Sequence, residues 1–138
     1  MDRKETLDRI CRDFDLLAVY LFGSRQDDGL RLLNGEEVSR EISDLDVGVL
    51  FRDNDPNFHR LAVLDGELAD LFSPLRVDLV PLQRVDSIFQ ANAIDGHRIA
   101  APDSTAADLY ELLVMRKAAE LLPIQRRIEE EVFGFSTS

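Results

Sequence analysis

Apolar positions along the chain follow two kinds of pattern. They recur at helical spacing over about residues 4–14, which predicts an amphipathic first helix. Three later segments, 16–22, 45–51 and 76–82, are almost continuously apolar. Runs of this length are typical of strands buried on both faces of a sheet.

Polar and turn-forming residues separate these strands. Residues 25–43 predict a short helix followed by a long loop or hairpin. A second helix is expected after the turn at residues 53–57, because leucines then recur at helical spacing until Ser73 and Pro74 stop it. A short helix through residues 88–94 is expected next.

The last third of the chain predicts a short edge strand at residues 97–100 and then helix over residues 105–131. Pro123 is expected to divide that segment into two helices, because proline removes a backbone donor. Strands that alternate with helices indicate an α/β (α+β) fold, a small sheet flanked by helices. We expect one domain over residues 1–138, with a C-terminal helical element at about 103–133.

The C-terminal segment also carries a helical repeat of apolar side chains, which indicates core or an interface. The residues are Leu109, Leu112, Leu113, Met115, Ala119 and Leu122.

Composition narrows the class of protein. The net charge of −11 repels polyanions, so we expect no stable nucleic-acid binding. No apolar stretch approaches the length of a membrane span, and no export segment is visible, so we expect a cytoplasmic protein. The single cysteine, Cys11, is expected to be a small buried apolar residue of the first helix. His59 and His97 lack companions at useful spacing and are expected to be exposed or hydrogen-bonded.

Gly23 and Ser24 end the first apolar run. Glycine allows a sharp turn and a close approach to the main chain, and a helix that begins there would favour a phosphate. The same pair also serves purely structural turns. Arg25, which follows directly, could reach a phosphate or cap the turn.

Asp44 and Asp46 stand at the entrance of the second strand. Residues i and i+2 of a strand project from one face, about 6.5–7 Å apart. Two carboxylates on one face of an apolar strand are costly unless they are solvated, paired or bound to a metal. Their oxygens are the ligands that Mg²⁺ prefers. The pair therefore indicates either a metal site or a solvated strand end.

Asp78 is a third carboxylate, in the middle of the third predicted strand. If the second and third strands are neighbours, Asp78 can face Asp44 and Asp46. Three convergent carboxylates suit a two-metal site, and Asp78 could also accept a proton as general base. The alternative is a carboxylate that is solvated or paired with Arg76.

Together these segments resemble the nucleotidyltransferase signature of the DNA polymerase β superfamily: residues 21–25 (LFGSR), 43–49 (SDLDVGV) and 77–80 (VDLV). Residues 93–100 (AIDGHRIA) and the helical tail also resemble small prokaryotic members, the minimal nucleotidyltransferases (MNT) encoded beside HEPN-domain proteins. The resemblance implies the nucleotidyltransferase fold, with a small mixed sheet and C-terminal helices.

The resemblance also implies a site. Gly23 and Ser24 would hold the triphosphate, with Arg25 beside them, and Asp44 and Asp46 would bind Mg²⁺. Asp78 would complete the metal site or serve as base. The family usually places about ten residues between its Gly-Ser and its first Asp, whereas nineteen intervene here. A longer loop costs only about 0.6 kcal/mol per doubling of its length, so the insertion need not break the fold.

The function implied is transfer of AMP from Mg·ATP to an acceptor hydroxyl. In the MNT family the acceptor is a tyrosine of a partner HEPN toxin, and the enzyme is an antitoxin. Two alternatives stay open: a non-catalytic antitoxin that neutralises its partner by complex formation, and a small-molecule nucleotidyltransferase, which this length disfavours. The sequence also leaves open a homo-oligomer.

Overall fold

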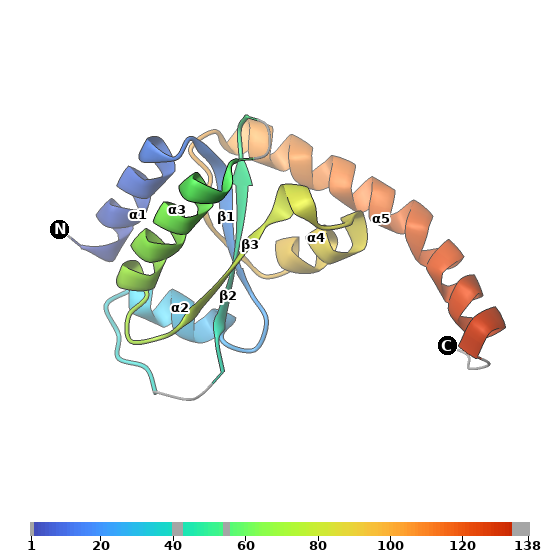
Figure 1. The fold of residues 1–138 in the computed structure, drawn as a ribbon, viewed down its shortest axis with the longest axis horizontal. Coiled ribbons are helices and arrows are strands. Elements are labelled where there is room, and N and C mark those ends of the chain that lie inside the picture. Colours follow the sequence, from blue (N-terminus) through green and yellow to red (C-terminus); the bar gives the residue numbers. More distant parts are fainter. Residues whose placement is uncertain (1, 40–42, 54–55, 134–138) are drawn as a thin grey trace.

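The computed structural model describes residues 2–39, 43–53 and 56–133 (Figure 1). Its elements follow the order α1 (Arg3–Asp13), β1 (Leu16–Phe22), α2 (Gln26–Leu33), β2 (Leu45–Phe51), α3 (Phe58–Leu71), β3 (Val77–Pro81), the 3₁₀ turn η1 (Leu82–Arg84), α4 (Ser87–Ile94), β4 (His97–Ala100) and α5 (Ser104–Phe133). The predicted strands and the helices that alternate with them are all present. Parts of the predicted loops, residues 40–42 and 54–55, lie outside the described residues.

The four strands form one mixed sheet in the order β3-β2-β1-β4. β1 pairs antiparallel with β2 on one side and with β4 on the other. β3 runs parallel to β2, so the chain crosses over through α3 between them. The expectations of a small mixed sheet and of an edge strand at residues 97–100 are therefore confirmed.

Both faces of the sheet are covered by helices, as the continuous apolar strands predict (Figure 1). Val19, Leu21 and Val47 point into the larger core, which contains side chains of α1, α2 and α3. Tyr20 and Phe22, one position out of phase, point into a smaller core with side chains of α4 and α5. The alternation of a strand thus divides β1 between two cores.

Side-chain caps fix where the helices begin. Asp2, Asn57 and Asp86 each accept a hydrogen bond of 2.8 Å from the backbone amide three residues later. Such caps satisfy amide groups that the first turn of a helix leaves free. The predicted helix start after the turn at residues 53–57 is therefore confirmed at Asn57, and α3 ends at Leu71, before Pro74.

The prediction that Pro123 divides the C-terminal segment is wrong. α5 is one helix from Ser104 to Phe133 with Pro123 inside it. Pro123 removes the amide that would bond to the carbonyl of Ala119. Both residues are exposed, so water can satisfy that carbonyl and the helix continues.

The apolar repeat of α5 does not form the core. The buried side chains of α5 are Ala107, Val114 and Ala118, whereas Leu109, Leu112, Leu113 and Met115 are 48–58% exposed. Small residues allow α5 to lie close to α4 and β1, which explains why an alanine-rich face packs inward. The expectation that the apolar repeat forms part of the core is therefore wrong, and the expectation of an interface stays a prediction. No described helix is long and apolar enough to cross a membrane.

Candidate functional site

Gly23 and Asp46 meet where β1 ends. Phe22 is paired with Asp46 across β1 and β2, and Gly23 follows with φ +77°. A Cβ atom added at Gly23 would lie 2.1 Å from Oδ2 of Asp46. A glycine is therefore needed here twice, for its backbone conformation and for the space that the carboxylate occupies.

Asp78 lies beside Asp46 because β2 and β3 are parallel neighbours in which these two residues are register partners. Partners in a parallel pair project from the same face of the sheet. Asp44 precedes the first residue of β2 and is exposed, as is Asp78, whereas Asp46 is partly buried. The strand adjacency on which the sequence argument depended is present.

The three carboxylates interact electrostatically. Burial raises the pKa of Asp46 above its ordinary value, and so do the charge of Asp78, a side-chain hydrogen bond with Asp78, and the charge of Asp44. The donor set is therefore acidic, oxygen-rich and mutually repulsive, which is the chemistry that a divalent cation relieves.

Asp44 has a cationic partner. Nε of Arg76 lies 3.6 Å from Oδ1 of Asp44, and both side chains are at least half exposed. Arg76 therefore pairs with Asp44, whereas the sequence suggested Asp78. Within residues 2–39, 43–53 and 56–133, no three histidine, cysteine or acidic side chains are already drawn together as a metal cage. A cation would thus have to compete with the Arg76 contact.

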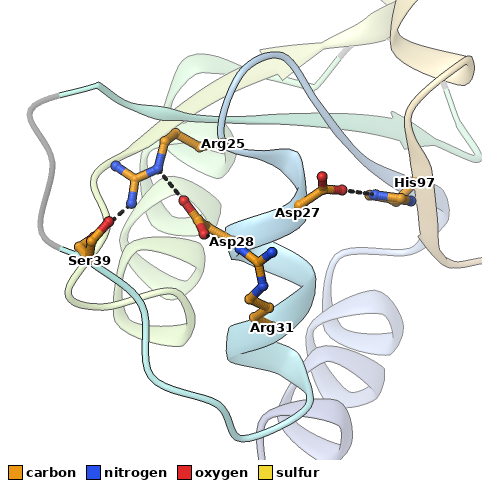
Figure 2. A network of polar contacts seen from close by, with 6 residues as sticks. All are labelled: Arg25, Asp27, Asp28, Arg31, Ser39 and His97. Atoms are coloured by element: carbon orange, nitrogen blue, oxygen red, sulfur yellow. Dashed lines mark hydrogen bonds and ion pairs between the residues drawn. The ribbon is translucent and has the colours of Figure 1, made fainter.

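Ser24 and the beginning of α2 follow directly on Gly23 in the chain. Gly23 and Ser24 are exposed, and α2 begins two residues after Ser24. The acidic side chains of its first turn are engaged elsewhere: Asp28 binds Arg25, and Asp27 lies 2.8 Å from Nε2 of His97 (Figure 2). The expectation of a hydrogen-bonded His97 is confirmed, and His59 is exposed.

Arg25 lies with the loop rather than on the exposed surface beside Ser24. Its side chain binds Asp28 and the backbone carbonyl of Ser39 (Figure 2). It also binds the backbone carbonyl of Ser43. Sequence reasoning considered a phosphate or a turn cap for Arg25 and missed these partners. The acidic residue three positions later could have indicated the Asp28 partner, but no sequence signal indicates the two carbonyls.

The long connection between Gly-Ser and the first Asp contains a helix. Eight of the nineteen residues form α2, which packs against the sheet through Leu32 and Leu33. The connection therefore includes a packed helix before the chain returns to Asp44.

Solved structures share this fold. A mutant of the toxin–antitoxin complex MntA–HpeT matches with a TM-score of 0.70 and 19% identity over 94% of this chain and 98% of the other. A toxin–antitoxin structure with AMP-PNP matches with a TM-score of 0.69 and 21% identity over 94% and 98%. The Shewanella oneidensis complex of a tri-AMPylated HEPN toxin with its MNT antitoxin matches with a TM-score of 0.67 and 19% identity over 95% and 96%.

Sequence comparison gives the family. No curated protein matches the chain significantly. The family model described as polymerase beta nucleotidyltransferase matches residues 5–105, which include all three carboxylates and the Gly-Ser turn. The chain therefore belongs to the polymerase beta nucleotidyltransferase family.

Proposed function

We propose that this protein transfers AMP from ATP to a hydroxyl of a HEPN-domain toxin and so acts as its antitoxin. The observation that carries the proposal is the contact of Gly23 with Asp46, with Asp78 as register partner of Asp46. This contact brings an open glycine turn for a triphosphate directly beside carboxylates for a metal ion.

Asp44, Asp46 and Asp78 would hold Mg²⁺. Their oxygens fit it chemically, and the mutual repulsion that raises the pKa of Asp46 is what a cation would offset. When bound, Mg²⁺ would neutralise charge on the triphosphate. Gly23 and Ser24 would bind phosphate oxygens through backbone amides and the serine hydroxyl.

The proposed reaction is a substitution at the α-phosphorus of ATP. The acceptor oxygen forms a bond to the α-phosphorus of ATP while the bond from that phosphorus to the bridging oxygen breaks, and pyrophosphate leaves. The hydroxyl proton passes to Asp78, which is exposed and therefore reachable by an acceptor. Positioning and charge neutralisation supply the rate gain.

A protein acceptor fits the surface of the chain. Beyond Ala118, the described part of α5 contains no buried side chain, and Figure 1 shows this half of the helix projecting away from the sheet. Leu121, Leu122, Ile124, Ile128 and Val132 are 38–67% exposed there. A projecting apolar helix is suited to packing against another protein.

The HEPN toxin is the partner that the similar structures suggest. One of them contains an AMPylated HEPN toxin with an MNT antitoxin, and another is a toxin–antitoxin structure with AMP-PNP. We expect the acceptor to be a tyrosine hydroxyl and the reaction to occur in the cytoplasm, where ATP and Mg²⁺ are available.

The test is an incubation of the protein with Mg²⁺, ATP labelled on the α-phosphate and the HEPN protein of the neighbouring gene. We expect label on the HEPN protein, no label from ATP labelled on the γ-phosphate, and loss of transfer with Asp44→Asn or Asp46→Asn. EDTA should abolish transfer as well.

The competing function is neutralisation by binding alone, which the ion pair of Asp44 with Arg76 favours because it occupies a proposed metal ligand. Under this alternative, Asp44→Asn and Asp46→Asn still neutralise the toxin and no label is transferred. That result would replace the enzyme with a binding module.

A further inference from the structure

The guanidinium of Arg25 is enclosed by the connection that leads to Asp44. Among the residues that the structure describes, Arg25 is the only charged residue in the interior, with 2% exposure. Nε donates to Oδ2 of Asp28 at 2.7 Å. One terminal nitrogen donates to the carbonyl of Ser39 at 2.7 Å (Figure 2). The other donates to the carbonyl of Ser43 at 3.2 Å.

These contacts join the two ends of the connection. Arg25 directly follows the Gly-Ser turn, and Ser43 directly precedes Asp44. On the other side of Asp44, the amide of Leu45 donates to the carbonyl of Arg76 at 2.8 Å. The backbone on both sides of Asp44 is therefore tied, by Arg25 before it and by the strand that leads to Asp78 after it.

We propose that Arg25 is a positioning residue: it closes the connection and places Asp44 in the carboxylate cluster without contacting ATP. This inference rests on the function proposed above. A phosphate contact would require the guanidinium to leave at least three acceptors, and a planar guanidinium with fixed donors is suited to hold several carbonyls at once.

Arg25→Lys is the main variant, because lysine keeps the charge and the length but supplies a single ammonium. Arg31→Lys is the matched control. Arg31 lies in α2 and binds Oδ1 of the same Asp28 at 2.7 Å. Its side chain is 54% exposed, and no described side-chain contact links it to the loop.

The two possible roles of Arg25 predict different kinetics. If Arg25 positions Asp44, Arg25→Lys lowers the rate of AMP transfer at saturating ATP about 100-fold and changes KM for ATP less than about twofold, because small displacements of reacting groups are costly. Arg31→Lys should match the wild type in both. A raised KM with an unchanged rate at saturation would show that Arg25 binds the triphosphate and would overturn the proposal.

Hydrogen exchange tests the clamp without any activity. In the protein without ATP, the hydrogen-bonded amides of Glu36 and Leu45 should exchange about tenfold faster in Arg25→Lys than in the wild type and in Arg31→Lys. Unchanged exchange at these amides would overturn the clamp. If the wild type transfers no AMP, the proposed function fails while the exchange result still decides the role of Arg25.

A second variant covers the case in which Arg25→Lys does not fold. Asp28→Asn leaves Arg25 in place and removes the charge that its Nε binds. We expect a smaller increase in exchange at Glu36 and Leu45 and a smaller fall in rate, again without a change in KM. Exchange and kinetics like those of the wild type would contradict the clamp.

Discussion

Gly23 and Asp46 are joined by a contact that permits no side chain at position 23. The carboxylate oxygen Oδ2 of Asp46 lies 2.1 Å from where a Cβ of residue 23 would be. The contact arises because Asp46 faces the last residue of β1 across the antiparallel pair. The contact therefore holds the turn after β1 against the Asp46 carboxylate of β2.

Gly23→Ala tests this contact. The methyl group must displace Asp46, so we expect AMP transfer to fall at least about 100-fold while the protein still folds. Gly35→Ala is the matched control: Gly35 also has a positive φ, +82°, but a Cβ there meets no atom within 4 Å. We expect both variants to lose about 1–2 kcal/mol of folding free energy through the backbone, and chemical denaturation would measure this loss. Equal activity of the two variants would contradict a role for the contact.

Asp46→Asn should stabilise the protein when no metal is present. The raised pKa of Asp46 means that its charged form is disfavoured in the folded state by burial and by Asp78 and Asp44. Removing the charge therefore raises Tm in EDTA, by about 3 °C. Added Mg²⁺ should raise Tm of the wild type but not of Asp46→Asn. A lower Tm for the variant in EDTA would show that the carboxylates do not repel one another.

Tyr20 ties the sheet to α5. Its buried hydroxyl donates to Oε2 of Glu111 at 2.7 Å. Burial, and to a smaller extent this hydrogen bond, raises the pKa of Tyr20. Tyr20→Phe should lower the free energy of unfolding by about 1.5 kcal/mol, measured by urea denaturation. Tyr110→Phe is the control, because the buried hydroxyl of Tyr110 has no hydrogen-bond partner among the described residues, and should change it by less than about 0.5 kcal/mol.

Cys11 should be inert in the folded protein. Its side chain is 3% exposed, and burial raises the pKa of the thiol to about 11. The thiolate, which is the reactive form, is present at only about one part in a thousand at pH 8 and becomes abundant only as the pH approaches 11. We expect a disulfide reagent to label Cys11 within minutes in urea but not in buffer at pH 8. Rapid labelling of the native protein would contradict this burial.

The distal half of α5 should serve binding rather than stability. Removing residues 120–138 deletes no described buried side chain, so we expect the free energy of unfolding to change by less than about 1 kcal/mol. The truncated chain should lose its complex with the HEPN protein, measured by size-exclusion chromatography. The pair Leu121→Gln and Ile128→Gln should weaken the complex with the helix intact. An undiminished complex would place the interface elsewhere.

The sequence by itself determined most of the fold. The first three strands are almost continuous apolar runs, and several helices have a periodic face or a capping residue such as Asn57. Such local signals depend on neighbours along the chain, and so they can be read before any tertiary contact is known. The turn conformation of Gly23 belongs to this class, whereas the common face of Asp44 and Asp46 stays a prediction.

Tertiary structure decided what depends on distant partners. Asp78 joins Asp46 only because β3 is parallel to β2 in one register, and a shift of one residue would have turned it to the other face. Arg25 directly follows the Gly-Ser turn, where the sequence suggested a phosphate contact. In the folded chain its guanidinium instead binds the carbonyls of residues 39 and 43. The buried face of α5 was decided in the same way, because packing space for small side chains, rather than hydrophobicity, selects Ala107 and Ala118 over the leucines.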